Sequence, residues 1–186
     1  MEVIRRIVKH LEIGAVCMIA NRAHEASGSR YFGARWLRRR LMGSAAASGR
    51  NHCLVAVDDQ RIGSPVGYVL YRLESDGDKY HKSGSRSIEI VDIAVTPERQ
   101  RRGIGTSLLH GILEHHSLLL EGLGLYLPER NEVARKFFVA RGFLATGFVR
   151  EWDDSGDGAI RFDMLVWSDK TDKPDKPRNW RRAAGG

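Results

Sequence analysis

The segment from Gln100 to Thr106 carries the residue types that most directly suggest chemistry. It reads QRRGIGT and follows an apolar stretch typical of a strand and precedes one typical of a helix. The first N–H groups of a helix have no partner within it and lie at the positive end of its dipole, so they favour a phosphate or pyrophosphate. Gly103 and Gly105 let an anion approach the backbone, and Arg101 and Arg102 add positive charge. We expect phosphate contacts from Gln100, Arg101, Arg102, Gly103, Ile104, Gly105 and Thr106.

Two other phosphate-binding loops do not fit this segment. The dinucleotide-binding fingerprint needs a third small residue where the chain has Leu108, and the P-loop needs a Gly-Lys-Ser/Thr run that the chain lacks. The alternative that stays open is a tight strand-to-helix turn with solvated arginines.

Hydrophobic periodicity and turn residues indicate which elements position the loop. Strands are expected at residues 4–8, 52–57, 66–73, 88–95, 123–127, 143–152 and 160–167. Helices are expected from the first strand to about residue 25, and at 31–42, 105–120 and 132–141. Asn131 is the expected N-cap of the last helix and Gly142 its C-cap, while residues 43–50 form a linker. The order is β-αα-βββ-α-β-α-ββ.

Two motifs in this order resemble those of the GNAT N-acetyltransferase superfamily. One is Gln-x-x-Gly-x-Gly after a strand that ends in Ala-Val; the other is a helix with Asn131, Ala134, Phe137, Gly142 and Phe143. The resemblance covers about residues 3–167 and extends loosely to the ribosomal-protein N-terminal and histone acetyltransferase branches. It implies a mixed α/β fold with a mostly antiparallel seven-stranded sheet, in which the fourth and fifth strands splay apart. It also implies acetyl-CoA as co-substrate and no metal.

The resemblance further implies where acetyl-CoA binds. The pantetheine arm fills the gap between the splayed strands, and a backbone N–H near the end of the fourth strand, at Ile93, Ala94 or Val95, binds the thioester oxygen. Asn131 contacts the pantetheine or fixes its loop, and Phe138 lies near the sulfur of CoA.

Glu89 is the candidate general base. An alkyl amine has a pKa near ~10 and attacks only as the free base, and a carboxylate in apolar surroundings can accept its proton. Strand alternation predicts that Glu89 shares a face with Val91, Ile93 and Val95, an unusual place for a charge. Its position resembles that of the catalytic glutamate of histone acetyltransferases. The alternatives are a solvated Glu89, one paired with an arginine such as Arg86, and Asp92 on the opposite face as the base.

The proton donor is where the chain departs from the family pattern. Many members have a tyrosine near the sulfur of CoA, whereas this chain has Phe138, which cannot donate a proton. Because a thiol has a pKa near ~8.5, water can suffice. Otherwise Tyr126, at the end of the fifth strand, supplies the hydroxyl, or the protein binds CoA without catalysis.

Length and composition agree with a single soluble domain. The chain has 186 residues, of which 42% are hydrophobic and 28% charged. The expected domain covers residues 1–167, and the basic segment 168–186 reads as a disordered tail. No secretory signal or membrane-spanning run is visible, and Cys17 and Cys53 lack metal-ligand spacing, so a cytoplasmic location is expected.

Charge gives a first expectation for the acceptor. Four acidic residues are expected on the last hairpin, namely Glu151, Asp153, Asp154 and Asp157. They favour a cationic amine as acceptor, such as a lysine, a protein N-terminus, a polyamine or an amino sugar. The net charge of +7 and the arginines within residues 35–40 leave open an acyltransferase acting on an RNA-associated amine. A non-catalytic CoA-binding module is the other alternative. We expect a monomer or homodimer without membrane contact.

Overall fold

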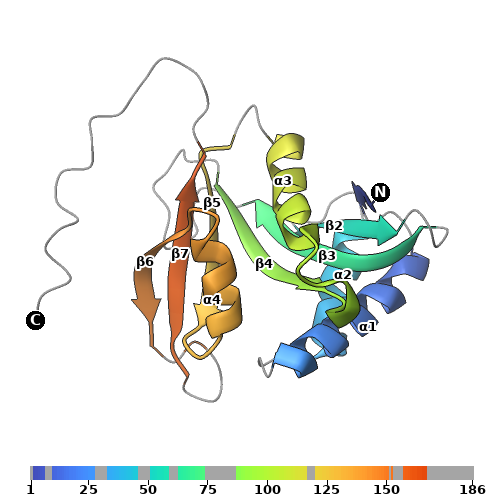
Figure 1. The fold of residues 1–186 in the computed structure, drawn as a ribbon, viewed down its shortest axis with the longest axis horizontal. Coiled ribbons are helices and arrows are strands. Elements are labelled where there is room, and N and C mark those ends of the chain that lie inside the picture. Colours follow the sequence, from blue (N-terminus) through green and yellow to red (C-terminus); the bar gives the residue numbers. More distant parts are fainter. Residues whose placement is uncertain are drawn as a thin grey trace, which may run out of the picture.

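A computed structural model of the chain describes residues 2–6, 10–27, 33–45, 51–58, 63–73, 87–116, 120–150, 152 and 157–166. These residues form a sheet with helices on both faces (Figure 1). In chain order the elements are β1 (Glu2–Arg6), α1 (His10–Ser27), α2 (Ala34–Ala45), β2 (Asn51–Asp58), β3 (Ser64–Leu73), β4 (Ser87–Val95), the 3-10 turn η2 (Pro97–Arg99), α3 (Ile104–His116), β5 (Gly122–Pro128), α4 (Glu132–Val139), β6 (Leu144–Val149) and β7 (Ala159–Leu165). The expected order of strands and helices is confirmed.

The sheet has seven strands in the order β1-β2-β3-β4-β5-β7-β6. Neighbouring strands are antiparallel, except that β4 and β5 are parallel. The parallel pairing joins Ser87–Ile90 to Gly122–Leu125 and then stops, although β4 continues to Val95 and β5 to Pro128. Figure 1 shows β5, β6 and β7 turning away from β4 beyond this point. The expected splay of the fourth and fifth strands is therefore present.

Apolar side chains fill two cores, one on each face of the sheet. The core under α3 and α4 includes Leu54, Val69, Ile88, Ile90, Leu108, Ile112, Leu125 and Phe138. The core under α1 and α2 includes Val16, Leu37, Leu41, Val55, Tyr68 and Leu70. Strands β2 to β4 are covered on both faces, which explains their nearly continuous apolar sequence.

Several element boundaries differ from the sequence prediction. Helix α2 continues to Ala45 and so includes Gly43 of the expected linker. Helix α3 is described to His116; residues 117–119 lie outside the described residues, and the expected end at residue 120 is wrong because Leu120 is not helical. Gly43 does not end α2, because a glycine within a helix costs only about 1 kcal/mol relative to alanine and most helical stability comes from packing of the apolar face.

The outer strands are also displaced or shortened. Strand β1 begins at Glu2, earlier than the expected residue 4, because its pairing with β2 begins at Glu2 opposite Asp58; residues 7 and 8 lie outside the described residues. Strand β6 ends at Val149 rather than at Trp152, because Trp152 N–H donates a hydrogen bond to Asp157 O and closes the hairpin outside the ladder.

Helix α4 begins where its sequence indicates and is closed by the predicted glycine, but its regular part is two residues shorter than the expected 132–141. The Asn131 side chain accepts a hydrogen bond from Ala134 N–H at 3.1 Å, which satisfies an amide of the first turn. Gly142 has φ +87°, and Phe143 N–H donates to Phe138 O at 3.2 Å. This left-handed glycine closes the helix, although regular helical structure ends at Val139.

Candidate functional site

The glycine-rich loop connects β4 to α3 through the turn η2. Arg101 and Gly103 both have a positive φ, of 62° and 82°. For an arginine this conformation costs roughly 1–2 kcal/mol, a kind of strain that is common at functional sites. The hydrogen bond from Ser107 N–H to Gly103 O, at 2.9 Å, closes the first helical turn. The N–H groups of residues 104–106 precede that turn and form the anion-binding end of α3.

Each residue of the loop has a different structural role. Gln100 donates its side-chain N–H to Val95 O at 3.1 Å and thereby ties the loop to the end of β4. Ile104 is buried, so its backbone is the part able to contact a ligand. A Cβ on Gly105 would lie 3.0 Å from the Phe137 ring, so the packing of α4 is by itself a reason for a glycine there. A Cβ on Gly103 would meet nothing within 4 Å, so the surface there is open.

Arg141 adds a cation to the loop that the sequence did not indicate. Its Nε and Nη2 donate to Thr106 Oγ1 at 3.0 and 2.6 Å, and its Nη1 donates to Phe137 O at 2.6 Å. Its guanidinium lies 3.7 Å from the centre of the Phe137 ring, and burial lowers the pKa of Arg141 below its ordinary value. From the sequence alone, Arg141 reads as a basic residue at the end of a helix.

A cleft of about 110 Å³ opens where β4 and β5 separate; we call it the strand cleft. Of the predicted site residues it is lined by Ile93, Tyr126, Asn131 and Phe138, and His24, Asp92 and Trp152 border it as well. Ala94 is buried toward α1 and α2, and Val95 packs toward α3, so both lie outside the cleft lining. Glu89 does not line the cleft.

A β-bulge in β4 decides which side chains face each other. Leu70 pairs with Asp92 and Tyr71 with Ile90, so Val91 is an extra residue in the ladder. The bulge reverses the alternation of inward and outward side chains along β4. The sequence prediction for this strand was therefore wrong in two respects: Glu89 does not share a face with Ile93 and Val95, and Asp92 lies on the same face as Glu89.

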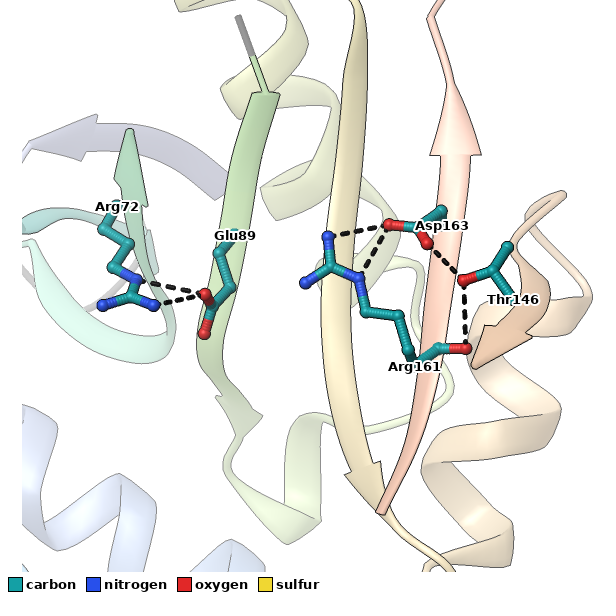
Figure 2. A network of polar contacts seen from close by, with 5 residues as sticks. All are labelled: Arg72, Glu89, Thr146, Arg161 and Asp163. Atoms are coloured by element: carbon teal, nitrogen blue, oxygen red, sulfur yellow. Dashed lines mark hydrogen bonds and ion pairs between the residues drawn. The ribbon is translucent and has the colours of Figure 1, made fainter. Parts of the chain in front are cut away.

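Glu89 is held by an arginine on the neighbouring strand. Arg72 Nε and Nη2 lie 3.1 and 2.6 Å from Glu89 Oε2 (Figure 2), and the Glu89 side chain is 11% exposed. An ion pair of this kind compensates the burial of the carboxylate. Glu89 is therefore paired with an arginine, as one of the alternatives predicted, and that arginine is Arg72. Arg86 lies outside the described residues.

Asp92 belongs to a second polar cluster on the same face. His24 Nε2 on α1 lies 3.2 Å from Asp92 Oδ1, and the hydroxyl of Tyr68 donates to Asp92 Oδ2. The His24 and Asp92 side chains are 17% and 11% exposed, and Tyr68 is fully buried. The sequence separates His24 from Asp92 by most of the N-terminal half of the domain, so no spacing rule could have joined them.

A larger cleft of about 530 Å³ lies on β5, β7 and β6, on the face opposite α4; we call it the outer cleft. Arg161, which is 8% exposed, binds Asp163 Oδ1 through Nε and Nη2, both at 2.8 Å. The Thr146 hydroxyl donates to the other oxygen of Asp163. Figure 2 shows the Arg161 side chain reaching across β5, in the space left by Gly124, whose Cβ would lie 1.9 Å from Arg161 Nη2.

Tyr126 lies between the strand cleft and the outer cleft, because it lines both. Its ring stacks on Trp152 with centroids 4.5 Å apart, and the Arg161 guanidinium lies over the Tyr126 ring, 4.9 Å from its centroid. The stack fixes the ring at the border between the two clefts.

The remaining sequence expectations concern the acidic hairpin, the arginines of α2, metal ligands and membrane spans. Asp157 pairs with Arg130 at 3.3 Å, and the remaining acidic residues of the hairpin lie outside the described residues, as does the basic tail. On α2, Arg35, Arg38 and Arg39 are exposed. Within the described part of the chain, no group of three or more His, Cys, Asp or Glu is placed to hold a metal ion. No helix there is both long and apolar enough to cross a membrane.

Comparison with known proteins agrees with this geometry. The sequence model of the Acetyltransferase (GNAT) family matches residues 15–143. The chain belongs to the GNAT acetyltransferase family. As a GNAT protein it is an acyltransferase that uses acetyl-CoA, and the anion-binding end of α3, the splayed strands and the strand cleft fit this co-substrate.

Solved GNAT structures share the fold at low identity. A protein from Desulfovibrio desulfuricans assigned to the family is 20% identical, with a TM-score of 0.72 over 89% of this chain and 99% of that one. The Escherichia coli ribosomal-protein-S18-alanine N-acetyltransferase is 17% identical, with a TM-score of 0.67 over 92% and 99%. Arabidopsis thaliana NAA60 in complex with acetyl-CoA is 15% identical, with a TM-score of 0.68 over 89% and 99%. No curated protein matches by sequence.

Proposed function

We propose that this GNAT protein transfers the acetyl group of acetyl-CoA to a primary amine by direct attack. The observation that carries the proposal is the junction at Tyr126, where the strand cleft meets the outer cleft. A thioester held between β4 and β5 reaches this junction from one side, and an acceptor in the outer cleft reaches it from the other. Such an arrangement holds the two substrates close together and correctly oriented, which contributes strongly to the rate of a two-substrate reaction.

The loop and the edge of β4 provide the acetyl-CoA contacts. The backbone N–H groups at the start of α3, with Arg141 beside them, bind the pyrophosphate. Beyond Ile90 the edge of β4 no longer pairs with β5, so its backbone groups are available to the pantetheine arm. A backbone N–H at Ile93, where β4 borders the strand cleft, polarises the thioester carbonyl.

The outer cleft indicates what kind of acceptor fits. Charges alternate across the sheet from Arg72 to Glu89, Arg161 and Asp163, and the register places Glu89, Gly124 and Asp163 in one row. A surface of paired charges suits a polar acceptor with several hydrogen-bonding groups better than a simple polycation. We therefore favour a peptide amine, from an N-terminus or a lysine, over a polyamine. The name of the Escherichia coli relative, a ribosomal-protein-S18-alanine N-acetyltransferase, is consistent with this choice.

A CoA-binding protein without catalysis is the second candidate, and Phe138 favours it. Phe138 borders the strand cleft and is 1% exposed, so no hydroxyl stands at this position to protonate the leaving sulfur. The transferase is nevertheless the better proposal, because a thiol with a pKa near ~8.5 is a fair leaving group without an acid.

Binding and turnover together test the proposal. Calorimetry measures acetyl-CoA affinity, and a thiol reagent follows CoA release with peptides carrying a free N-terminus, N-blocked lysine peptides, polyamines and amino sugars. We expect acetyl-CoA binding and amine-dependent CoA release that is fastest with a peptide. Tight binding without amine-dependent release from any acceptor would instead establish the CoA-binding module.

A further inference from the structure

We propose that His24 and Asp92 form the proton-accepting pair of this transferase, in place of Glu89. The inference rests on the proposed amine acetyltransfer. Its basis is that both side chains border the strand cleft, although one comes from α1 and the other from the bulge of β4. The bulge matters because it turns Asp92 toward α1, where His24 Nε2 lies 3.2 Å from Asp92 Oδ1.

The pair has the arrangement that a general base requires. An imidazole is the side chain best suited to exchange protons near neutral pH, and a carboxylate on one ring nitrogen fixes its tautomer and stabilises the imidazolium. With Nε2–H donating to Asp92, the lone pair resides on Nδ1. Tyr68 donates to the second oxygen of Asp92 and so acts as a positioning residue for the carboxylate.

Glu89 is placed less well for the same task. Two N–H groups of Arg72 hold its Oε2, and the side chain does not border the strand cleft. Its position in the register, opposite Arg72 on β3 and Gly124 on β5, makes it part of the charged row under the outer cleft. We assign Glu89 to that row, as an acceptor-side or structural residue.

The proposed step balances as follows. The amine nitrogen attacks the thioester carbon, the N–C bond forms, and the C–S bond breaks with its electron pair on sulfur. Before the attack the imidazole of His24 takes one proton from the bound ammonium, and Asp92 balances the resulting positive charge. Water takes the second proton that the nitrogen loses as the C–S bond breaks. The imidazolium or water then protonates the thiolate, which gives free CoA and restores His24. This route needs no tyrosine at position 138.

His24 and Asp92 have titratable neighbours on several elements. Among the described residues these are Tyr68 on β3, which donates to Asp92, Tyr126 on β5, which borders the same cleft, and Cys53 on β2, whose thiol pKa is raised by burial and by the Asp92 carboxylate. Arg22, two residues earlier on α1, is engaged by Glu98 of η2.

Affinity labelling tests the placement without knowledge of the acceptor. Bromoacetyl-CoA carries an electrophilic carbon beside the thioester carbonyl, so an imidazole nitrogen within reach displaces bromide and forms a stable N–C bond. We expect mass spectrometry of digested protein to find the adduct on His24, with labelling prevented by excess acetyl-CoA and absent in His24→Gln. Labelling of another residue, or none, in a protein shown to bind acetyl-CoA overturns the assignment and leaves the proposed function standing.

Kinetics test the role itself. With the best peptide amine, His24→Gln and Asp92→Asn should each lower kcat/KM by roughly 10²–10⁴, the usual worth of general base catalysis. With hydroxylamine, which is already neutral at neutral pH, the same variants should lose less than about tenfold, because no ammonium must be deprotonated. A merely structural role would lower both rates equally and overturn the inference. His110→Gln, on the exposed face of α3, is the matched control.

Glu89→Gln completes the comparison. If its loss with the peptide exceeds that of His24→Gln, and hydroxylamine removes that loss, the base is Glu89 and the inference is overturned. A protein that binds no acetyl-CoA at all refutes the proposed function as well as this inference, and calorimetry on the wild type identifies that case.

Discussion

Arg141 shows how much one side chain can contribute to a site that is otherwise made of backbone. It joins Thr106 on α3 to the carbonyl of Phe137 on α4, so it places a guanidinium at the start of α3 and holds the two helices together. Hydrogen bonds that involve a charged group contribute about 1.5–3 kcal/mol each. The residue therefore has a structural and an electrostatic role at once.

Arg141→Gln should weaken acetyl-CoA binding by about tenfold or more, which corresponds to at least about 1.4 kcal/mol. The affinity of the variant should also depend less on salt concentration, because one phosphate-facing cation is lost. Calorimetry at two salt concentrations measures both effects. Arg130→Gln, on an exposed arginine, serves as the control. Equal salt dependence in Arg141→Gln and wild type would limit Arg141 to helix packing.

Tyr126 has a hydroxyl that sequence reasoning offered as a proton donor. If His24 or water protonates the thiolate, Tyr126→Phe should change the rate of CoA release by less than about tenfold, since the thiol pKa is near ~8.5. Tyr126→Ala should lose far more, because it removes the stack with Trp152 and Arg161 between the two clefts. A rate measurement on the two variants separates the hydroxyl from the ring, and a large loss in Tyr126→Phe would restore Tyr126 as the acid.

At the scale of elements, the turn between β4 and α3 and the bulge in β4 do most to build the site. The turn sets a left-handed Gly103 before the first amides of α3, and the bulge directs Asp92 toward α1. Both features are local backbone conformations, and each changes what the neighbouring side chains can reach.

Gly103→Ala should weaken acetyl-CoA binding by about tenfold, or about 1.4 kcal/mol, because the added methyl stands on the open surface where a pyrophosphate approaches. The matched control is Gly63→Ala in the turn before β3, since Gly63 also has a positive φ and open space at its Cβ position. The two variants should have similarly lowered melting temperatures, because each places an alanine at a positive φ. Equal acetyl-CoA affinity in both would remove Gly103 from the binding loop.

At the scale of the molecule, one sheet carries both clefts, and the splay of β4 and β5 opens the strand cleft. Residues of α1, β4, β5 and α4 border the strand cleft, while β5, β6 and β7 form the outer cleft. The sheet keeps α1 and α2 over β2 to β4 and leaves the corresponding face of β5, β6 and β7 to the outer cleft, as far as the described residues extend. The acetyl donor and the acceptor can thus approach from different sides.

The domain proposed from the sequence ends near residue 167, so a chain of residues 1–167 should keep the melting temperature and acetyl-CoA affinity of the full chain. The same pair tests the alternative of an RNA-associated amine. Retention on RNA that falls with salt and disappears in the shorter chain would place an RNA contact in the basic segment. A large fall in melting temperature on truncation would show instead that residues 168–186 belong to the folded domain.

The sequence by itself determined the order of elements, the glycine turn between β4 and α3 and the caps of α4, because these depend on local signals: periodicity, glycine and a capping side chain. Asn131, Gly103 and Gly142 act within a few residues of their positions. The tertiary structure decided the rest. A bulge leaves no mark in an apolar run, so the face of Asp92 was not readable, and contacts such as His24 with Asp92 or Arg141 with Thr106 join segments that only the fold brings together.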